Sequence, residues 1–139
     1  MSMAETFGME IFASNKRFFS GRARSLAIPA ADGERVFLAH HSNMVCAIIP
    51  GEMRFEDESG QKTVVAVSSG FVEMINNRVK VFCFSVERPE EIDIRRAQEA
   101  KERAEEQLRQ KQSIQEYHMN QMALARAMTR LRVTKKQEL

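Results

Sequence analysis

Side chains that can act as nucleophiles, general bases or metal ligands are few in this chain, and their spacing fits no catalytic or metal site. His40 and His41 are adjacent and His118 is remote, with no cysteine or acid at ligand spacing, so they do not predict a zinc site. The stretch Ser68-Ser69-Gly70 lacks the G-x-S-x-G pattern of a nucleophile elbow. The reactive residues therefore give no indication of an enzyme, a bound metal or a required cofactor.

Two further stretches match reactive motifs only in part. Gly60–Thr63 reads GQKT, but the full G-x-x-x-x-G-K-[ST] pattern of a phosphate loop is missing, and a hairpin is expected there instead. Cys46 and Cys83 both lie in apolar runs, without the C-x-x-C spacing of a redox pair. These two cysteines could form a disulfide, but reduced thiols in the core are the favoured interpretation.

Carboxylates gather at the start of the last third of the chain. Pro89 is followed by Glu90, Glu91 and Asp93. Proline is favoured at the first position of a helix, and acids in the first turn complement the positive end of the helix dipole. We therefore expect a helix to begin at Pro89, with these acids in its first turn rather than in a catalytic pair.

Basic residues gather near the C-terminus. They are Arg126, Arg130, Arg132, Lys135 and Lys136, and the acid near them is Glu138. Cations complement a helix C-terminus, but this cluster exceeds what a cap needs. Two interpretations stay open: a solvated helix end, or a surface that contacts an acidic partner. No aromatic residues interleave the cluster, which argues against single-stranded nucleic acid as that partner.

The elements that must position these residues differ between the two parts of the chain. From residue 6 to residue 86 apolar and polar side chains alternate with a period close to two, as in Phe7, Met9 and Ile11. Turn signals such as Asp32-Gly33 and Asn76-Asn77 interrupt the alternation at short intervals. Many short strands at this spacing predict an antiparallel sandwich or barrel.

Two helices are expected after Pro89. The first carries a narrow apolar stripe of Ala97, Ala100, Ala104 and Leu108, which suits close packing against one partner helix. The second carries apolar or neutral residues at steps of three and four, namely Ile114, Tyr117, Gln121, Leu124, Met128 and Leu131. Residues 109–115 between them hold no glycine or proline, so the two helices could be continuous or loosely hinged.

The totals fit a small water-exposed protein. The chain has 139 residues and a net charge of +2, which gives no general indication of nucleic-acid binding. The apolar run Met44–Pro50 is far shorter than the roughly 20 residues that span a bilayer. Residues 1–7 have neither the basic nor the apolar region of a signal peptide. We expect any membrane association to depend on protein partners.

Several stretches, taken in order, resemble one family. FFSGRARSLAIPAADGERVFLAHHSNMV is similar to its FSG…GxxGxLPGHAPL region, and IIPGEMRF to L-K-PG-x-x-R. VAVSSGFVEMINNRVKVF is similar to AVSGGFVEV…NxVTV, and EEIDIRRAQEAKERAEEQL and MALARAMTRLRV to its two C-terminal helices. Each motif alone is weak, but five in the family's order cover essentially the whole chain. The family is the epsilon subunit of F-type ATP synthases.

The resemblance implies an α+β fold, with an antiparallel β-sandwich followed by an antiparallel two-helix hairpin. Residues 1–88 would form the sandwich, which binds the gamma subunit and the c-subunit ring. Residues 89–139 would form a regulatory hairpin, which folds on the sandwich or extends toward the alpha/beta catalytic hexamer and inhibits ATP hydrolysis. The implied function is that of a non-catalytic central-stalk subunit, which couples ion flow through the membrane ring to ATP synthesis.

The resemblance also implies contacts for particular residues. Arg126, Arg130 and Arg132 are expected to contact acidic residues of the catalytic hexamer. Glu34 and His41 match residues of a loop that faces the c ring, although Ala39 and His40 replace the family's Pro-Gly. Losing Pro-Gly is expected to loosen or reshape that turn.

Some members of the family bind regulatory ATP through a motif of the form I/L-D-x-x-R-A. The residues that match this motif and its partners are Glu87, Ile92, Asp93, Arg96, Ala97, Arg126 and Arg130. Arginines from two helices can hold phosphates, while carboxylates accept hydrogen bonds from base or ribose. The alternative is that Asp93 only caps the helix and pairs with Arg96.

Two other functions stay open at this stage. The chain could be a free-standing sensor that binds ATP and changes its helix packing, or an adaptor with mobile helices. The resemblance favours a peripheral place on the cytoplasmic face of the bacterial inner membrane, with the chloroplast thylakoid membrane as the alternative. Whether the hairpin rests folded or extended is not decided by the residues.

Overall fold

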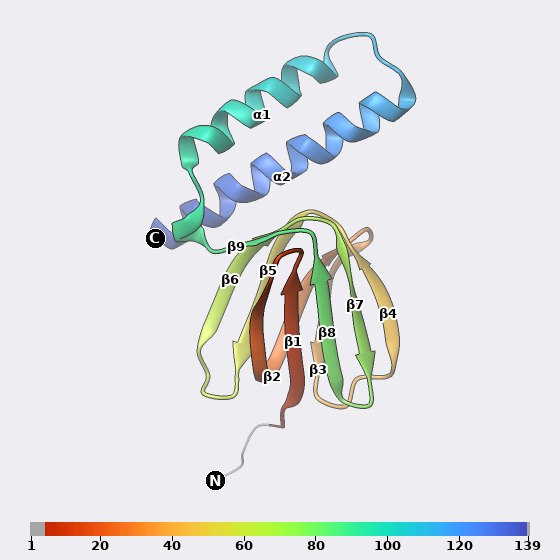
Figure 1. Ribbon diagram of the computed structural model, residues 1–139, viewed down its shortest axis with the longest axis vertical. Helices are drawn as coiled ribbons and strands as arrows, with labels where there is room; N and C mark the ends of the chain where they lie inside the picture. The colour runs from red at the N-terminus through yellow and green to blue at the C-terminus, as the bar shows by residue number, and fades with distance from the viewer. Residues whose placement is uncertain (1–4, 139) are drawn as a thin grey trace.

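The computed structural model describes residues 5–138, which form a β-sandwich with a helical hairpin across one end (Figure 1). The strands are β1 (Phe7–Ala13), β2 (Lys16–Ala30), β3 (Gly33–Leu38), β4 (Met44–Ile48), β5 (Gly51–Asp57), β6 (Lys62–Val67), β7 (Gly70–Ile75), β8 (Arg78–Cys83) and β9 (Val86–Glu87). The helices are the 3₁₀ turn η1 (Pro89–Glu91), α1 (Ile94–Leu108) and α2 (Ile114–Glu138). The predicted α+β class, a sandwich followed by two helices, is confirmed.

The strands pair in the order β4-β7-β8-β1-β2-β5-β6-β9, and β3 also pairs with β2. All pairs are antiparallel except β1 with β8, which is parallel. The prediction of a purely antiparallel sandwich is wrong at this pair. The two strands are separated by most of the sandwich sequence, so no hairpin turn fixes their relative direction.

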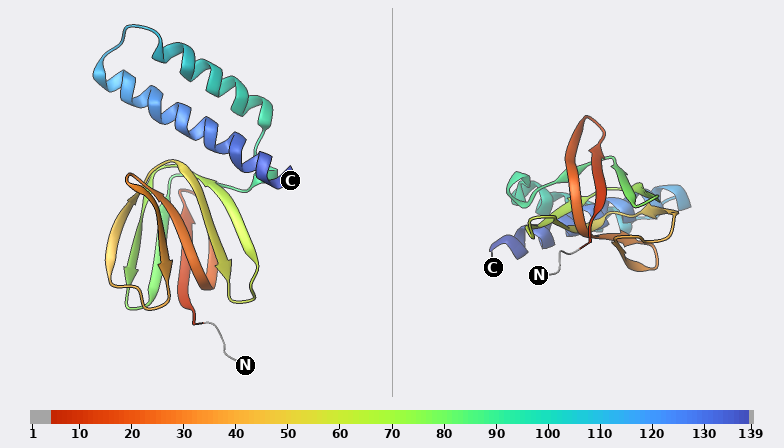
Figure 2. Two further views of the ribbon diagram at one scale, coloured as in Figure 1. Left: turned by 180° about the vertical axis from the view of Figure 1, so that it is seen from behind. Right: turned by 90° about the horizontal axis from the view of Figure 1, so that it is seen from below.

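Strand β2 belongs to both layers of the sandwich. Its first half pairs with β1, and its second half pairs with β3 and β5. The register shifts between Ala23 and Ser25, where the strand passes from one layer to the other. Such an irregularity bends a strand and increases its twist, which lets one long strand close the two layers (Figure 2).

The core lies between the layers and consists of the inward residues of the alternating pattern. The largest fully buried side chains are Phe7, Met9, Ile11, Leu26, Ile28, Phe37, Met53, Val65, Val72, Met74, Val79 and Val81. Both cysteines are free thiols; Cys83 is buried in this core and Cys46 is half-buried on β4. Their sequence-based interpretation as reduced thiols agrees with the structure.

The α-helical part begins later than predicted. Pro89 starts a 3₁₀ turn and not an α-helix, and α1 starts only at Ile94. The side chain of Asp93 is the N-cap, because its Oδ1 accepts a hydrogen bond of 3.1 Å from the backbone N–H of Arg96. The extended backbone at Ile92 and Asp93 separates the turn from the helix.

The open question of the helix break is settled by Ser113. Its Oγ accepts a hydrogen bond from the backbone N–H of Glu116 at 3.1 Å and lies 3.1 Å from a carboxylate oxygen of the same residue. Ser-x-x-Glu is the capping-box pattern, so α2 begins afresh here without any glycine or proline. The two helices therefore form an antiparallel hairpin, whose connecting loop projects away from the sandwich (Figure 1).

A small apolar cluster joins the hairpin to the sandwich. Ala66 on β6, Ile92, Ala97 on α1 and Val133 on α2 form one buried cluster, with Val64 and Leu131 packed against it. The predicted alanine stripe of α1 is confirmed at Ala97 and Ala104, which are buried. A seam of small residues buries little apolar area, so the hairpin is held weakly compared with the core.

The predicted stripe of α2 is wrong for several residues. Ile114 is 90% exposed, and Tyr117, Gln121 and Met128 are exposed too. The buried residues of α2 are instead Ala127, Thr129, Val133 and Thr134. The sequence prediction relied on large apolar residues, whereas close packing of helices favours small ones. Threonines are also accommodated, because their hydroxyls donate to backbone carbonyls of the preceding turn.

Candidate functional site

A polar cavity lies where the sandwich meets the hairpin. It has a volume of about 320 Å³, and its lining residues come from β9, η1, α1 and α2. They are Glu87, Glu91, Ile92, Asp93, Arg96, Ala97, Glu99, Ala100, Arg103 and Arg130. Six of the seven residues that match the family's nucleotide motif are therefore brought together at one cavity. Its volume is at the lower end of the roughly 300–1,000 Å³ that is typical of small-molecule sites.

One ion pair connects α2 to the sandwich at this cavity. The Nε of Arg130 donates to Oε1 of Glu87 at 2.6 Å, across 43 positions of sequence. Both side chains are about two-thirds buried, with 34% and 27% exposed. A charge-assisted hydrogen bond in partial shelter from water is stronger than one on the open surface. The pair therefore fixes the C-terminal half of α2 against β9.

Asp93 and Arg96 contact each other through the backbone and not through both side chains. The Asp93 carboxylate accepts from the Arg96 amide, as the capping alternative predicted. The Arg96 guanidinium makes no ion pair or hydrogen bond with other residues that the structure describes, and its side chain is exposed. It lines the cavity with a full set of donors, which suits a phosphate or carboxylate ligand.

Arg126 is the one residue of the predicted set that does not line this cavity. It is half-buried one turn before Arg130 and borders a separate space of about 10 Å³ with Ser68, Ser85 and Glu87. A space of this size holds at most one water molecule. Glu87 and Arg130 line both spaces, so in this arrangement Arg126 lies next to the cavity but does not line it. Its part in binding ATP stays a prediction.

Sequence reasoning missed Arg103 among the cationic residues of the cavity. It follows Arg96 by seven residues, which places both on one face of α1. Ala97 and Ala100 leave room between them, since alanine carries no side chain beyond Cβ. The same seven-residue spacing would have identified Arg103 in the sequence.

Arg126, Arg130 and Arg132 do not share one free surface. Arg126 and Arg130 are half-buried toward the sandwich, while Arg132 is exposed. Arg132 lines another groove, of about 420 Å³, between α2 and the turns after β2 and β4. Glu34 lines the same groove and pairs with Arg54.

Glu34 and His41 do not lie in one loop, so the prediction is wrong on that point, while their contact with the c ring stays a prediction. Glu34 is within β3, opposite Pro29, while His41 follows the other end of the strand. The six residues of β3 hold them apart, because an extended strand rises about 3.3 Å per residue. His41 lies against Phe37, with ring centroids 4.8 Å apart.

The turn that carries His41 is held by the side chains of two asparagines. His40 takes a left-handed backbone with φ of 64°, at the position where the family pattern has glycine. Its backbone N–H donates to Oδ1 of Asn77 at 2.6 Å, and Asn43 accepts from the N–H of Asn76 at 2.9 Å. Asparagine side chains thus fix the turn, and the prediction that it would be loose without Pro-Gly is not borne out by these contacts.

Comparisons with known proteins agree with this arrangement. Residues 6–89 match the family model described as ATP synthase, Delta/Epsilon chain, beta-sandwich domain, and residues 90–135 match that of its long alpha-helix domain. The chain belongs to the ATP synthase delta/epsilon chain family. The ATP synthase epsilon chain of Ruminiclostridium cellulolyticum is 40% identical over 129 residues, which is 93% of this chain and 96% of that one.

Other relatives and solved structures extend the likeness. The epsilon chain of Caldanaerobacter subterraneus subsp. tengcongensis is 37% identical over 96% of this chain and 97% of its own. A chain in the Euglena gracilis mitochondrial ATP synthase structure, titled OSCP/F1/c-ring in rotational state 1, matches with a TM-score of 0.80. It is 19% identical, and the match covers 100% of this chain and 85% of that one. At that identity the match shows the fold.

The described residues give no sign of a metal site or a membrane span. No group of three or more histidine, cysteine or acidic side chains among residues 5–138 is arranged to hold a metal ion. No helix within the same residues is both long and apolar enough to cross a bilayer.

Proposed function

We propose that the chain is the non-catalytic central-stalk subunit of an F-type ATP synthase. In this role residues 1–88 bind the gamma subunit and the c ring, and residues 89–139 regulate ATP hydrolysis. The observation that carries the proposal is that both parts of the chain match the family's models, in order and over nearly their full length. The subunit would sit at the membrane only through its protein partners, on the cytoplasmic face of a bacterial inner membrane or on a thylakoid membrane.

The outer face of the layer formed by β4, β7, β8 and β1 is the surface that we assign to gamma. Phe12, Phe82 and Phe71 stack in a row across three strands, with ring centroids 5.1 and 4.9 Å apart. Phe71 is 45% exposed, and Phe84 at the end of β8 is 75% exposed. Exposed aromatic residues gathered on one sheet face are typical of protein interfaces.

Co-purification tests this assignment. A tagged full-length chain is expected to retain gamma and the catalytic hexamer, and Phe84→Ser is expected to weaken gamma binding at least tenfold. Phe84 is mostly exposed, so its loss leaves the fold intact. Ile114→Ser on the hairpin tip is the control, because Ile114 is also largely exposed but is on α2 and not on the sheet. If neither gamma nor the hexamer co-purifies with the unaltered chain, the central-stalk role is wrong.

Inhibition of hydrolysis is proposed to require release of the hairpin. With the hairpin folded, Arg130 is engaged by Glu87 and Arg126 is half-buried, so neither is free to meet an acidic partner. Release would expose both, together with Arg132. Replacing all three by glutamate is expected to raise ATP hydrolysis by the assembled complex, since like charges would then repel the hexamer. Unchanged inhibition in this variant would count against the contact.

Regulatory ATP is proposed to bind the cavity between the helices. Arg96, Arg103 and Arg130 would face the phosphates, while Glu87 and Asp93 offer acceptors to ribose or base. Calorimetry of the isolated chain is expected to show binding that Arg96→Gln weakens at least tenfold. Arg109→Gln is the matched control, because Arg109 pairs with Glu106 and neither residue lines the cavity. No heat at millimolar ATP would reject the site.

The cavity is also the observation that keeps a second function open. A free-standing sensor would bind ATP there and change its helix packing without any stalk partner. Binding of ATP by a chain that never co-purifies with gamma would favour the sensor. The exposed aromatic row on the sheet supports the stalk subunit, since a stand-alone sensor has no use for it.

A further inference from the structure

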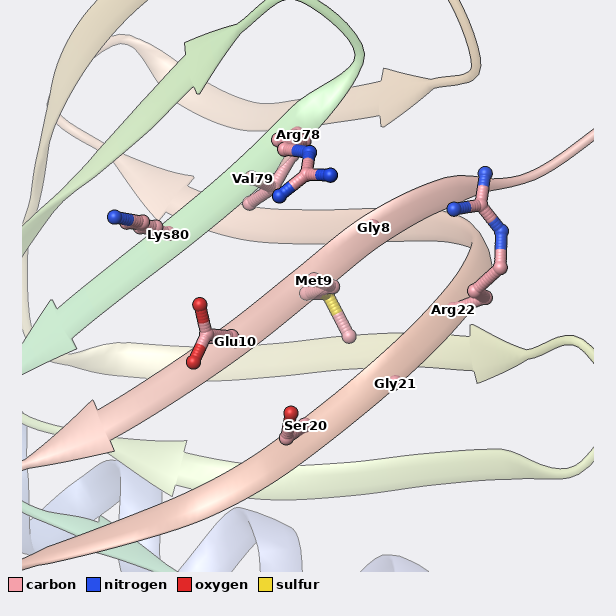
Figure 3. A pocket seen from close by; sticks show the side chains of 9 residues that line it. All are labelled: Gly8, Met9, Glu10, Ser20, Gly21, Arg22, Arg78, Val79 and Lys80. Atoms are coloured by element: carbon pink, nitrogen blue, oxygen red, sulfur yellow. The ribbon is translucent and has the colours of Figure 1, made fainter.

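A second groove lies on the outer face of β8, β1 and β2, outside the aromatic row through which we assign this layer to gamma. Its volume is about 300 Å³, and it is lined by Gly8, Met9, Glu10, Ser20, Gly21, Arg22, Arg78, Val79 and Lys80 (Figure 3). It is at the opposite end of the layer from the aromatic row, because Gly8 is the second residue of β1 and Phe12 is near the end of that strand. The helices contribute nothing to its lining.

The strand register places two arginines on either side of a glycine. Gly8 pairs with Arg78 on β8 and with Arg22 on β2. A Cβ at Gly8 would lie 3.6 Å from Cγ of Arg78 and 3.9 Å from Nη1 of Arg22. Because Gly8 has no side chain, the space between the two arginines stays open, as Figure 3 shows.

Among the described residues, neither guanidinium has a hydrogen-bond partner on the side that faces the space over Gly8. Arg22 is held from behind, since its Nε donates to Oγ1 of Thr6 at 2.8 Å and its Nη2 to the Thr6 carbonyl at 3.0 Å. Its Nη1 is the nitrogen that faces Gly8. The guanidinium of Arg78 makes no hydrogen bond or ion pair with any other residue among 5–138.

The cross-strand neighbours of Lys80 balance its charge, but the cross-strand neighbours of Arg78 do not. Lys80 stands between Glu73 and Glu10, so its charge faces a carboxylate on each side. Arg78 stands between Ile75 and Gly8, so neither of its cross-strand neighbours is an acid. Like charges on one face of a sheet repel each other, and only the strand of Gly8 separates Arg78 from Arg22. An anion over Gly8 would remove that repulsion.

We propose that this groove binds a phosphate group between Arg22 and Arg78, with Gly8 as its floor. Two guanidiniums offer paired N–H donors that match the oxygens of a phosphate. Three cations against one carboxylate in the lining leave two net positive charges, which suits a phosphate dianion. A free phosphate ester and a phospholipid headgroup share this chemistry.

The test is an NMR titration of the full-length chain with inorganic phosphate, against chloride at equal ionic strength. Phosphate is expected to cause saturable shifts of the Gly8, Arg22 and Arg78 amides, which chloride does not reproduce. Arg78→Gln is expected to weaken binding at least tenfold, and Arg95→Gln on the distant α1 is expected to leave it unchanged. Signals of the helix cavity are scored separately, so failure of the ATP proposal does not affect this result.

A second variant separates a built site from a merely positive surface. Gly8→Val suits a strand and keeps every charge, but its side chain fills the space between the arginines. It is expected to abolish the phosphate shifts. Equal binding by Gly8→Val, equal binding by Arg78→Gln, or no saturable shift in the unaltered chain would each overturn the proposal.

Co-sedimentation with vesicles identifies the source of the phosphate. Vesicles with phosphatidic acid are compared with vesicles of phosphatidylcholine alone. Retention by the first, lost in Gly8→Val, assigns a lipid headgroup. Binding of inorganic phosphate without any retention assigns a soluble phosphate compound.

Discussion

At the scale of single residues, His40 stands where the family pattern has glycine and takes a left-handed backbone. A left-handed backbone costs a residue with a Cβ roughly 1–2 kcal/mol, and glycine avoids that cost. The hydrogen bond of the His40 N–H to Asn77 does not depend on the side chain. The effect of the strained backbone on stability can therefore be measured separately from the effect of the imidazole.

Comparing His40→Gly with His40→Ala measures the strain. Both variants lose the imidazole, but only glycine relieves the positive φ of 64°. In urea unfolding, His40→Gly is expected to be more stable than His40→Ala by about 1 kcal/mol. Equal stabilities, or a more stable alanine variant, would show that the turn is unstrained.

The buried thiol of Cys83 gives a second residue-scale prediction. Burial raises its pKa from the ordinary 9.0 to about 12. The thiolate is the reactive form, so iodoacetamide at pH 8 is expected to modify Cys46 first and Cys83 only after unfolding. The pKa of the Cys83 thiol is higher in the folded chain than in the unfolded chain, so burial of the neutral thiol stabilises the fold fully below pH 9. That stabilisation is lost as the pH rises toward 12. Equal labelling of both thiols in the folded chain would contradict the burial.

The residues of the candidate site could be predicted from the sequence where they belong to the family motif or match its partners. The I-D-x-x-R-A pattern located Ile92, Asp93, Arg96 and Ala97, because these lie close together in the sequence. Arg103 was missed because it lies seven residues beyond Arg96, outside the motif but on the same face of α1. That Arg126 lies outside the cavity could not be predicted, because the contact between β9 and α2 depends on packing over more than 40 positions. Periodicity predicts which face of a helix is polar, but not which strand that face meets.

At the scale of elements, the alternating pattern predicted the sandwich well and the helix ends poorly. Strand faces follow a strict period of two, whereas the caps at Asp93 and Ser113 depend on single hydrogen bonds. The parallel pairing of β1 with β8 has no local signal at all, since it depends on the closure of the whole sheet. The exposed Ile114 shows that large apolar residues need not mark the packed face of a short hairpin.

The hold of α2 on the sandwich is expected to depend on Arg130. Arg130→Gln removes the charge that pairs with Glu87 and should cost roughly 1.5 kcal/mol of local stability. Hydrogen exchange at α2 amides should become about tenfold faster, with core strands unchanged. Arg132→Gln is the control, because Arg132 is exposed and has no ion partner among the described residues. Identical exchange in both variants would show that the small-residue seam alone holds the helix.

At the scale of the whole molecule, a stable sandwich carries a weakly attached hairpin. The sandwich has a continuous apolar core, while among residues 5–138 a small apolar cluster and the Glu87–Arg130 ion pair join the hairpin to it. Two arrangements that differ by only a few kcal/mol are what a ligand or partner can switch. The division between a docking part and a mobile part is therefore the central claim of the proposed function.

Truncation after Arg88 tests that claim most directly. The sandwich core contains no residue of the hairpin, so the shortened chain is expected to fold and to assemble with gamma and the hexamer. ATP hydrolysis by that complex is then compared with hydrolysis by the complex that holds the full chain. The account predicts full assembly with hydrolysis raised several-fold, and full assembly with unchanged hydrolysis would contradict it.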